Sequence, residues 1–499
     1  MVGFAIAVQL VILVVMLVKF QNQFVYFYAF SAILSLVVVL FIINGRSNPA
    51  YKLAWVVPIL LFPIFGGIFY LMFGRNHPSQ HEMKKMASAA MNFQAYMPEG
   101  KSDALLELEK TDKIGSLQSR YIRKYAQAEL CGQTETEYLS SGEMKFERML
   151  EELRKAEHFI FLEYFIIQEG VMWNAILEVL CQKAKEGVDV RLIYDDMGCI
   201  MTLPYGYDKK LEAMGIKCAR FNPFIPILSI RFNNRDHRKI CIIDGDIGIT
   251  GGINLADEYI NAIDKHGHWK DTAILLRGAA VWNLTVMFLS MWDYLRDSHD
   301  DCSLYRPGLY HPLPQVNDGY VQPFADSPLD GESVSETVYL NMINKAERYI
   351  YITTPYLIID NEMVVALQTA AKNGVDVRII TPHIADKWYV HAVTRAYYES
   401  LVECGVRIYE YTPGFIHAKT YVCDDKYAVV GTINMDYRSL YLHFECGAWL
   451  CDSSGVFAVR DDFVKILEVS GEVTLQQCRD VSWVRRLGRG LLKSFAPLM

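Results

Sequence analysis

One pattern occurs twice in the chain: a His-x-Lys triplet followed at fixed distances by Asp, Gly and Asn. The first copy begins with His237 (HRKICIID) and the second with His417 (HAKTYVCD), and GGIN and GTIN follow them at the same interval. Further matching stretches precede the two copies in the same order, namely AEHFIFL (156–162) with AERYIYI (346–352) and EGVDVRLI (186–193) with NGVDVRII (373–380). Self-similarity on this scale indicates a duplicated structural unit. The chain is therefore predicted to contain two copies of one fold.

Each copy has the composition of an α/β unit. In the first, the apolar run FIFLEYFI is followed by WNAILEVLCQKAKEG, which has helical spacing and ends at Gly187, and then by the β-branched run VDVRLIYD. Strands that alternate with helices of 10–15 residues predict a mixed or mostly parallel sheet. We place the two domains at residues 131–310 and 315–480. The stretch 295–333 is rich in Pro, Gly, Asp and Ser and is predicted to be a linker or a long surface loop.

The N-terminal region, residues 1–75, is unusually apolar. It holds three apolar runs, at about 3–18, 24–43 and 53–73, and about 20 apolar residues suffice to span a bilayer. The sequence therefore predicts two or three transmembrane helices ahead of a linker at 76–130, in a multi-pass integral membrane protein. Basic residues after the third run favour a cytoplasmic position for the large domain.

Charge and cysteine usage limit the kinds of ligand and cross-link that the protein can have. The net charge of −8 argues against nucleic acid as the main ligand. The eleven cysteines are scattered without C-x-x-C and indicate reduced thiols, with no disulfide framework or zinc site. The tail at 481–499 sets Arg485, Arg486, Arg489 and Lys493 among apolar residues, which is typical of a helix on anionic lipid, although an ordinary packed helix has the same composition.

The two His-x-Lys motifs have the side chains needed for phosphoryl transfer. Residues i and i+2 of a strand share a face, so His237 and Lys239 should point the same way, as should His417 and Lys419. One neutral histidine can attack phosphorus while the other, protonated, donates to the leaving alcohol. Lysines can offset the charge on the phosphate oxygens, so we predict no metal and no cofactor.

Other residues of the repeat are predicted to support this site. The glycines (Gly251, Gly252 and Gly431) permit close backbone approach, and the asparagines (Asn254 and Asn434) supply neutral donors. Asp244 lies seven positions past His237, and Asp424 has the same place in the second copy. That odd spacing predicts that Asp244 ties the strand end to the loop.

Two acidic residues are candidates to orient the imidazoles. Asp271 lies 34 residues past His237, and Glu445 lies 28 past His417, so we expect each to pair with the histidine of its own half. Glu163 is a polar residue inside an apolar strand, and it either lines a headgroup pocket or sits at a strand edge. Tyr164 and Tyr356 carry the same two alternatives.

These motifs resemble the phospholipase D superfamily, whose members carry HxK(x)₄D(x)₆GGxN twice. The first half fits fully and the second departs only at Thr432. The resemblance covers about residues 130–480. It implies that two α/β domains pack around one shared site and that the reaction passes through a phosphohistidine. It also implies the catalytic set His237, Lys239, Asp244, His417, Lys419 and Asp424.

Within the superfamily the layout is similar to the bacterial cardiolipin synthases, because the apolar segments end in PIFGGIFYLMFGR (63–75) and GGINLADEYI (251–260) follows the first motif. This resemblance implies transfer of a phosphatidyl group between two phosphatidylglycerol molecules in a bacterial cytoplasmic membrane. By family analogy His237 is the nucleophile. The alternatives are a hydrolase of the phospholipase D type and a transferase with another alcohol acceptor. A nuclease and a membrane scaffold with a decayed site are disfavoured. The oligomeric state stays open, a homodimer included.

Overall fold

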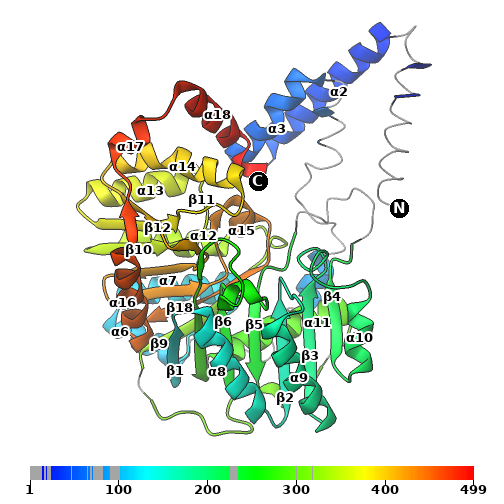
Figure 1. Ribbon diagram of the computed structural model, residues 1–499, viewed down its shortest axis with the longest axis vertical. Helices are drawn as coiled ribbons and strands as arrows, with labels where there is room; N and C mark the ends of the chain where they lie inside the picture. Colours follow the sequence, from blue (N-terminus) through cyan, green and yellow to red (C-terminus); the bar gives the residue numbers. More distant parts are fainter. Residues whose placement is uncertain are drawn as a thin grey trace.

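The computed structural model describes residues 24–45, 48–63, 83–89, 102–224, 234–298, 300–316 and 318–498, with the short stretches 14–15, 18–19, 66–67 and 70. Two α/β units make up the body, and a helical hairpin projects from it (Figure 1). The repeat and the α/β class predicted from the sequence are both present.

The first unit is built on a seven-stranded mixed sheet with the order β1-β8-β6-β5-β2-β3-β4. Its strands are β1 (Thr134–Leu139), β2 (Phe159–Tyr164), β3 (Asp189–Asp195), β4 (Lys217–Phe221), β5 (Lys239–Ile243), β6 (Ile247–Gly251) and β8 (Ala273–Gly278). β2, β3 and β4 are parallel, and the remaining pairs are antiparallel. Its helices are α8 (Gly142–Lys155), α9 (Val171–Lys185), α10 (Tyr207–Ala213) and α11 (Val281–Arg296).

The second unit repeats this order and adds one edge strand, giving β19-β13-β12-β10-β15-β16-β18-β9. Its strands are β9 (Tyr320–Asp326), β10 (Tyr349–Thr353), β12 (Asp376–Pro382), β13 (Arg407–Tyr411), β15 (Thr420–Cys423), β16 (Tyr427–Gly431), β18 (Glu445–Cys451) and β19 (Ser470–Glu472). Its helices are α12 (Val334–Lys345), α13 (Asn361–Lys372), α14 (Trp388–Val402), α15 (Tyr437–Tyr441), α16 (Ser454–Glu468), α17 (Leu475–Arg479) and α18 (Trp483–Ser494). A short parallel pair, β11 (Leu357–Ile358) with β17 (Met435–Asp436), completes it.

The two units share a core and a strand pairing. One apolar cluster joins Phe161 and Ile242 of the first sheet to Val422 and Val430 of the second, so the sheets pack against each other. In addition, β7 (His268–Lys270) of the first unit pairs in parallel with β14 (Gly414–Ile416) of the second. This crossing brings each unit's loops to the other unit's His-x-Lys motif.

Part of each segment predicted to be a linker is folded. Within 76–130, α6 (Asp103–Thr111) and α7 (Lys113–Tyr125) bury Leu105, Leu108 and Ile122 in the core of the second unit. Within 295–333, β9 forms an edge of the second sheet beside β18. Helical spacing of the apolar residues in 103–125 was the available signal for the first segment, whereas the turn residues of 295–333 obscured the strand in the second.

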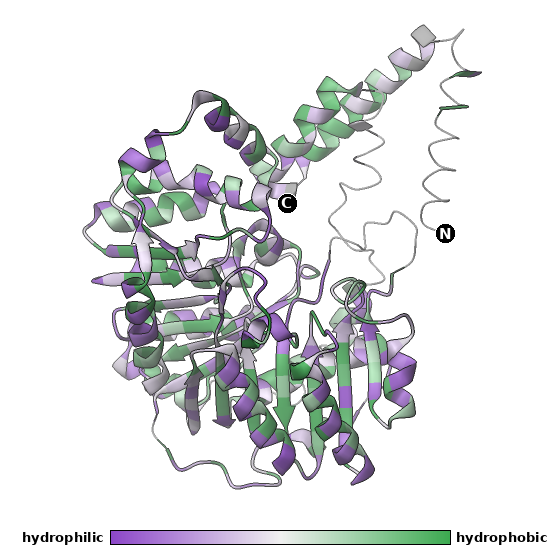
Figure 2. Cartoon of the chain, viewed as in Figure 1, coloured by the Kyte–Doolittle hydropathy of each residue, from purple (hydrophilic) through white to green (hydrophobic). Residues whose placement is uncertain are grey.

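The helical hairpin consists of α2 (Phe24–Asn44) and α3 (Pro49–Leu61). It is held by a small cluster that includes Val38, Trp55 and Ile59, and Figure 2 shows it largely in the colour of apolar residues. Within the part of the chain that is described, no helix combines the length and the apolar character needed to cross a membrane. The predicted transmembrane helices are therefore not confirmed, and the first of them, at 3–18, lies almost wholly outside the described residues.

Candidate active site

Both histidines lie in extended segments that precede their strands, not inside the strands as the sequence suggested. β5 begins at Lys239, two residues after His237, and β15 begins at Thr420, three residues after His417. Each segment has left its own sheet to pair with the other unit. The backbone N–H of His237 donates to the Phe444 carbonyl (2.9 Å), and that of His417 donates to the Lys270 carbonyl (2.7 Å).

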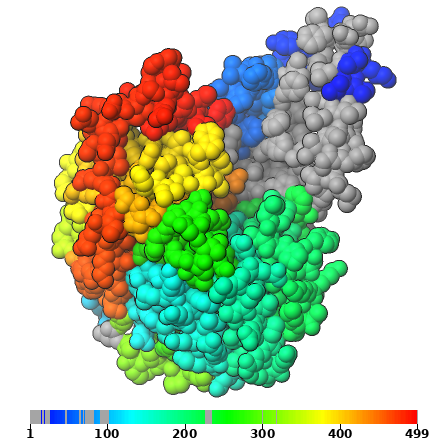
Figure 3. Space-filling view, in the orientation of Figure 1, coloured from blue at the N-terminus to red at the C-terminus, as the bar shows by residue number. Residues whose placement is uncertain are grey.

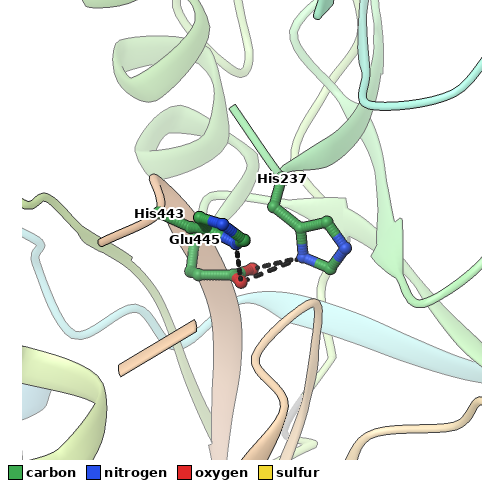
Figure 4. Close-up of side chains that lie close together, drawn as sticks. All are labelled: His237, His443 and Glu445. Atoms are coloured by element: carbon green, nitrogen blue, oxygen red, sulfur yellow. Dashed lines mark hydrogen bonds and ion pairs between the residues drawn. The ribbon is translucent and has the colours of Figure 1, made fainter. Parts of the chain in front are cut away.

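This crossing decides which carboxylate meets which histidine. His237 Nδ1 lies 2.9 and 3.0 Å from the two carboxylate oxygens of Glu445, and His417 Nδ1 lies 2.6 Å from Asp271 Oδ2. The two acids are the ones predicted, but the pairing within each half was wrong. The carbonyls of Phe444 and Lys270 accept from the opposite motif, so the residue after each faces the opposite imidazole. Figure 4 shows this for Glu445 and His237.

The carboxylates set the tautomer of each imidazole. Both acids are fully buried, and an ionised carboxylate accepts a hydrogen bond from Nδ1–H. The Nε2 lone pair of each ring is then free for chemistry. Burial alone would raise the pKa of Glu445, but its contacts with His237 hold that pKa well below the usual range. Asp271 has a lowered pKa as well, because Lys419 and His417 outweigh burial.

Burial depresses the basicity of the four catalytic candidates. It lowers the pKa of His237 to about 3 and that of His417 to about 4, so both rings are neutral at pH 7 in the free protein. It also lowers the pKa of Lys239 to about 8 and that of Lys419 to about 7. The charge of Lys239 further lowers the pKa of both His417 and Lys419, so the two motifs act on one another across the unit boundary.

The lysine ammonium groups are fixed beside the histidines. Lys239 donates to the carbonyl of His237, and Lys419 donates to the carbonyl of His417. Lys419 Nζ also lies 2.7 Å from His417 Nδ1. Both lysines are 1% exposed or less, so their charge acts in a low-dielectric setting where it stabilises a phosphate anion strongly.

The asparagines differ between the halves. Asn254 accepts a hydrogen bond from the Ile166 N–H (3.0 Å) and donates to the Tyr259 hydroxyl (2.7 Å), so much of its capacity is used within the protein. Asn434 is buried, and its Oδ1 has no hydrogen-bond partner among the described residues. Asn434 is therefore the freer of the two to bind a ligand.

The motif aspartates hold the far ends of the strands. The Asp244 carboxylate accepts the N–H groups of Glu157, His158 and Phe159 at 2.8 Å each. Asp424 accepts three N–H groups in the equivalent place, from residues 347 to 349. Each aspartate follows its strand at the end opposite the histidine, so the predicted structural role fits Asp244, and a direct part in the chemistry does not.

The comparisons with known proteins agree with this geometry. A family model described as "Cardiolipin synthase, PLD-like domain" matches residues 149–275 and 339–467, and one described as "Phospholipase_D-nuclease N-terminal" matches residues 33–75. A cardiolipin synthase of Halalkalibacterium halodurans is 35% identical over 481 residues, which is 94% of each chain. The chain belongs to the phospholipase D-like cardiolipin synthase family.

Two further relatives extend this finding. An uncharacterized protein of Streptococcus mutans is 42% identical, over 92% of this chain and 99% of its own. The crystal structure of a phosphatidylserine synthase from Haemophilus influenzae superposes with a TM-score of 0.58 at 16% identity, covering 76% of this chain and 97% of the other. At that identity the likeness concerns the fold alone.

The glycines of the family motif lie where a side chain would collide with the backbone of a neighbouring strand or with a carboxylate of the site. A Cβ on Gly252 would lie 2.1 Å from Asp271 Oδ1, and a Cβ on Gly431 would lie 2.5 Å from the Cys446 carbonyl. Gly251 has φ +154°, and a Cβ there would collide with the carbonyl oxygen of Thr272. At the one departure from the motif, the Thr432 hydroxyl donates to Glu445 Oε2. The substitution therefore adds a hydrogen bond to the carboxylate that orients His237.

Two of the three residues considered for a headgroup pocket or a strand edge are buried in the first unit. Glu163 is fully buried and lies 2.5 Å from Arg238, so it forms a buried ion pair. Tyr164 is 2% exposed, and its hydroxyl accepts from Lys145 Nζ (3.1 Å) inside the first core. Tyr356 is partly exposed and donates to Asp386 (2.6 Å). For Glu163 and Tyr164 neither alternative holds, because β2 is a central strand with both faces covered. For Tyr356 the pocket stays a prediction.

Sequence analysis missed His443, which lies beside the same carboxylate as His237. Its Nδ1 is 3.8 Å from Glu445 Oε1, and its ring centroid is 5.7 Å from that of His237 (Figure 4). Neither of its ring nitrogens has a hydrogen-bond partner among the described residues. Trp269 has the corresponding place beside His417, at 5.6 Å. The i, i+2 spacing of His443 and Glu445 was the available signal.

The ligand atoms of His237, His443 and Glu445 lie within 4.8 Å of one another, so this cluster has the composition and spacing of a divalent-metal site. Both carboxylate oxygens of Glu445 already receive hydrogen bonds, from His237 and Thr432. The arrangement of these contacts fits the orientation of an imidazole.

Proposed function

We propose that this protein is a cardiolipin synthase, a phosphatidyltransferase that moves the phosphatidyl group of one phosphatidylglycerol to a glycerol hydroxyl of a second and releases glycerol. The observation that carries the proposal is the pair of buried His–carboxylate contacts, one from each motif, with a lysine fixed beside each. Close similarity to cardiolipin synthases over more than nine-tenths of the chain supports the choice of lipid.

In the first step His237 Nε2 attacks phosphorus, and the bond from phosphorus to the glycerol oxygen breaks. The proton needed by that oxygen comes from His417, acting as an imidazolium. The substrate itself favours that charged form, because a phosphodiester anion in a dry site raises the pKa of a neighbouring base. Lys239 and Lys419 bind the non-bridging oxygens, and Glu445 stabilises the positive charge that His237 acquires.

In the second step His417 is the base. It removes a proton from the hydroxyl of the incoming phosphatidylglycerol, whose oxygen attacks phosphorus and displaces His237. The products are cardiolipin and the free enzyme, with both histidines restored to their starting state.

We also propose that residues 1–75 hold the enzyme at a bacterial cytoplasmic membrane, with the catalytic body on the cytoplasmic side. The exposed side chains of α2 and α3 support this, since Phe30, Phe41 and Leu61 are each more than 60% exposed, with little cover from other described residues. Exposed apolar surface of this extent is typical of a membrane contact. Extraction of membranes with alkaline carbonate should leave the protein in the lipid fraction, and release into the wash would contradict the proposal.

The activity test uses purified full-length protein in phosphatidylglycerol vesicles, with His237→Ala and His417→Ala as inactive variants and His311→Ala as a control. His311 is about half exposed, and its ion-pair contact with Asp244 (3.9 Å) lies at the strand end opposite His237, away from the reacting groups. We expect cardiolipin and glycerol in equal amounts from the wild type and the control, and neither product from the two variants. Phosphatidic acid in place of cardiolipin would identify a hydrolase. Turnover only with an added alcohol such as ethanolamine would identify a transferase with another acceptor.

A further inference from the structure

Helix α18 is turned with its apolar face outward. Trp483, Val484, Leu487 and Leu491 share one face, and their exposed fractions are 76%, 59%, 68% and 63%. A surface helix of a globular protein normally packs its apolar face on the core. The reverse arrangement leaves an apolar surface for which the described part of the chain supplies no cover.

The basic face of α18 lies against the body of the second unit. Arg486 donates to Glu399 of α14 (2.8 Å), and Lys493 Nζ lies 3.9 Å from the centroid of the Tyr397 ring. Leu492 packs on the core of the same unit. The orientation of the helix is therefore fixed by several contacts, and the outward apolar face is a consequence of them.

A cavity of about 400 Å³ lies under α18. Arg485 and Arg489 of the helix line it together with Arg395 of α14. Arg395 is already bound by Glu410 (2.8 and 2.7 Å). Neither Arg485 nor Arg489 has an anionic partner among the described residues, so the cavity holds uncompensated positive charge.

The remaining charged groups around the cavity do not balance it. Glu410 also accepts from His383 (2.9 Å), and Glu472 is paired with Arg407 (3.0 Å), so both acids are already bound by cations. Burial lowers the pKa of Arg489, and the neighbouring charges of Arg395 and Arg485 lower it further. An anion that entered the cavity would relieve this repulsion.

We propose that the cavity under α18 binds the phosphate headgroup of an anionic phospholipid of the bilayer, at a site separate from the two histidines. Guanidinium groups match the oxygens of a phosphodiester, and the apolar face of α18 would contact the acyl chains. The helix also adjoins α3, whose Leu53 and Leu60 are exposed. The two helices lie at the same end of the molecule (Figure 3).

The site goes beyond the proposed reaction, because it lies among β13, β19, α14, α17 and α18 and includes no residue of either His-x-Lys motif. It would retain an anionic lipid at the membrane surface and hold the catalytic body close to its substrate. A zwitterionic lipid, which carries its own cation, should compete poorly for unpaired arginines.

The test is a binding titration of the full chain in detergent, followed by native mass spectrometry, in a His417→Ala background that prevents turnover. The binding result then does not depend on which reaction the enzyme catalyses. The probes are phosphatidylglycerol, phosphatidylcholine with the same acyl chains, and inorganic phosphate. The variants are Arg485→Ala with Arg489→Ala, and Arg485→Glu alone, which changes an exposed position and leaves the packing of the helix intact. Arg486→Ala is the matched control, since it removes the same charge from the same helix outside the cavity. The exposed ion pair with Glu399 that it breaks is only one of the contacts that orient the helix, and those of Lys493 and Leu492 remain.

We expect the dissociation constant of phosphatidylglycerol at the cavity to rise on the order of 10-fold in the double variant, because charged hydrogen bonds are lost. At a lipid concentration that saturates only the parent, mass spectrometry should then show one bound phosphatidylglycerol fewer. Arg485→Glu should show the same direction, and Arg486→Ala should match the parent. Phosphatidylcholine and inorganic phosphate should not compete. Equal losses in the Arg486→Ala control, unchanged binding in both cavity variants, or saturation by inorganic phosphate alone would overturn the proposal.

Discussion

The crossed pairing of histidines and carboxylates can be tested by separating the two steps of the reaction. A phosphatidyl ester of p-nitrophenol has a leaving group that needs no proton, so its first step requires the nucleophile and not the general acid. The residues that support His237 should then matter in that step, and those that support His417 should not.

The structure gives the expected size of the effect. Glu445 is fully buried, and both its oxygens lie within 3.0 Å of His237 Nδ1. His237 becomes positively charged as it attacks, and leaving a buried charge without its partner costs about 3–5 kcal/mol. At about 1.4 kcal/mol per tenfold, Glu445→Gln should slow release of p-nitrophenol on the order of 10²–10⁴-fold. Asp271→Asn acts on His417 and should change that burst by less than about threefold, although it should abolish cardiolipin synthesis.

Stopped-flow absorbance at enzyme concentrations comparable to substrate measures the burst directly. If each carboxylate served the histidine of its own half, Asp271→Asn would abolish the burst and Glu445→Gln would spare it. With a burst that His237→Ala abolishes and His417→Ala retains, that result would refute the pairing described above. The same result with a burst that His417→Ala abolishes and His237→Ala retains would instead refute the assignment of His237 as the nucleophile.

Three further predictions follow from buried groups of the site. Since burial lowers the pKa of Lys419 to about 7, its cation is lost as pH rises through that value, and kcat/KM for phosphatidylglycerol should fall on the alkaline side of pH 7. In Lys419→Arg, which stays charged, the alkaline limb of the pH-rate profile should move up by at least one pH unit. An alkaline limb at the same pH would show that the titration of Lys419 does not cause it. Gly252→Ala should lower kcat at least 10-fold with a stable fold, because the added Cβ displaces the carboxylate of Asp271, and wild-type kcat would show that the carboxylate can move freely. Asp244→Ala should lower the free energy of unfolding by about 3 kcal/mol or more, as three backbone N–H groups lose a charged acceptor, and a urea titration with an unchanged midpoint would contradict that role.

The sequence predicted which residues form the site better than it predicted which carboxylate pairs with which histidine. The repeat, the two motifs and both carboxylates could be found because they recur at matching positions, and recurrence is visible in a single chain. The partner of each carboxylate could not be found, since β7 pairs with β14 across the units and nothing in either half records that exchange. Spacing in the sequence favoured the nearer histidine.

The buried position of Glu163 was hidden for a related reason. Its strand has apolar residues on both faces, and only the long-range contact with Arg238 explains a charge among them. His443 was missed because one histidine near a carboxylate has many ordinary explanations. The outward orientation of the apolar face of α18 could not be predicted either, because its amphipathic pattern is the same whichever face packs against the second unit.

The exchange of segments between the units has a consequence for biosynthesis. His237 acquires its carboxylate from Glu445 of the second unit, so the first unit by itself lacks the group that orients its own nucleophile. Activity begins only after the second unit has been made and has docked. A chain that ended before Glu445 would carry His237 without the acceptor that fixes its tautomer.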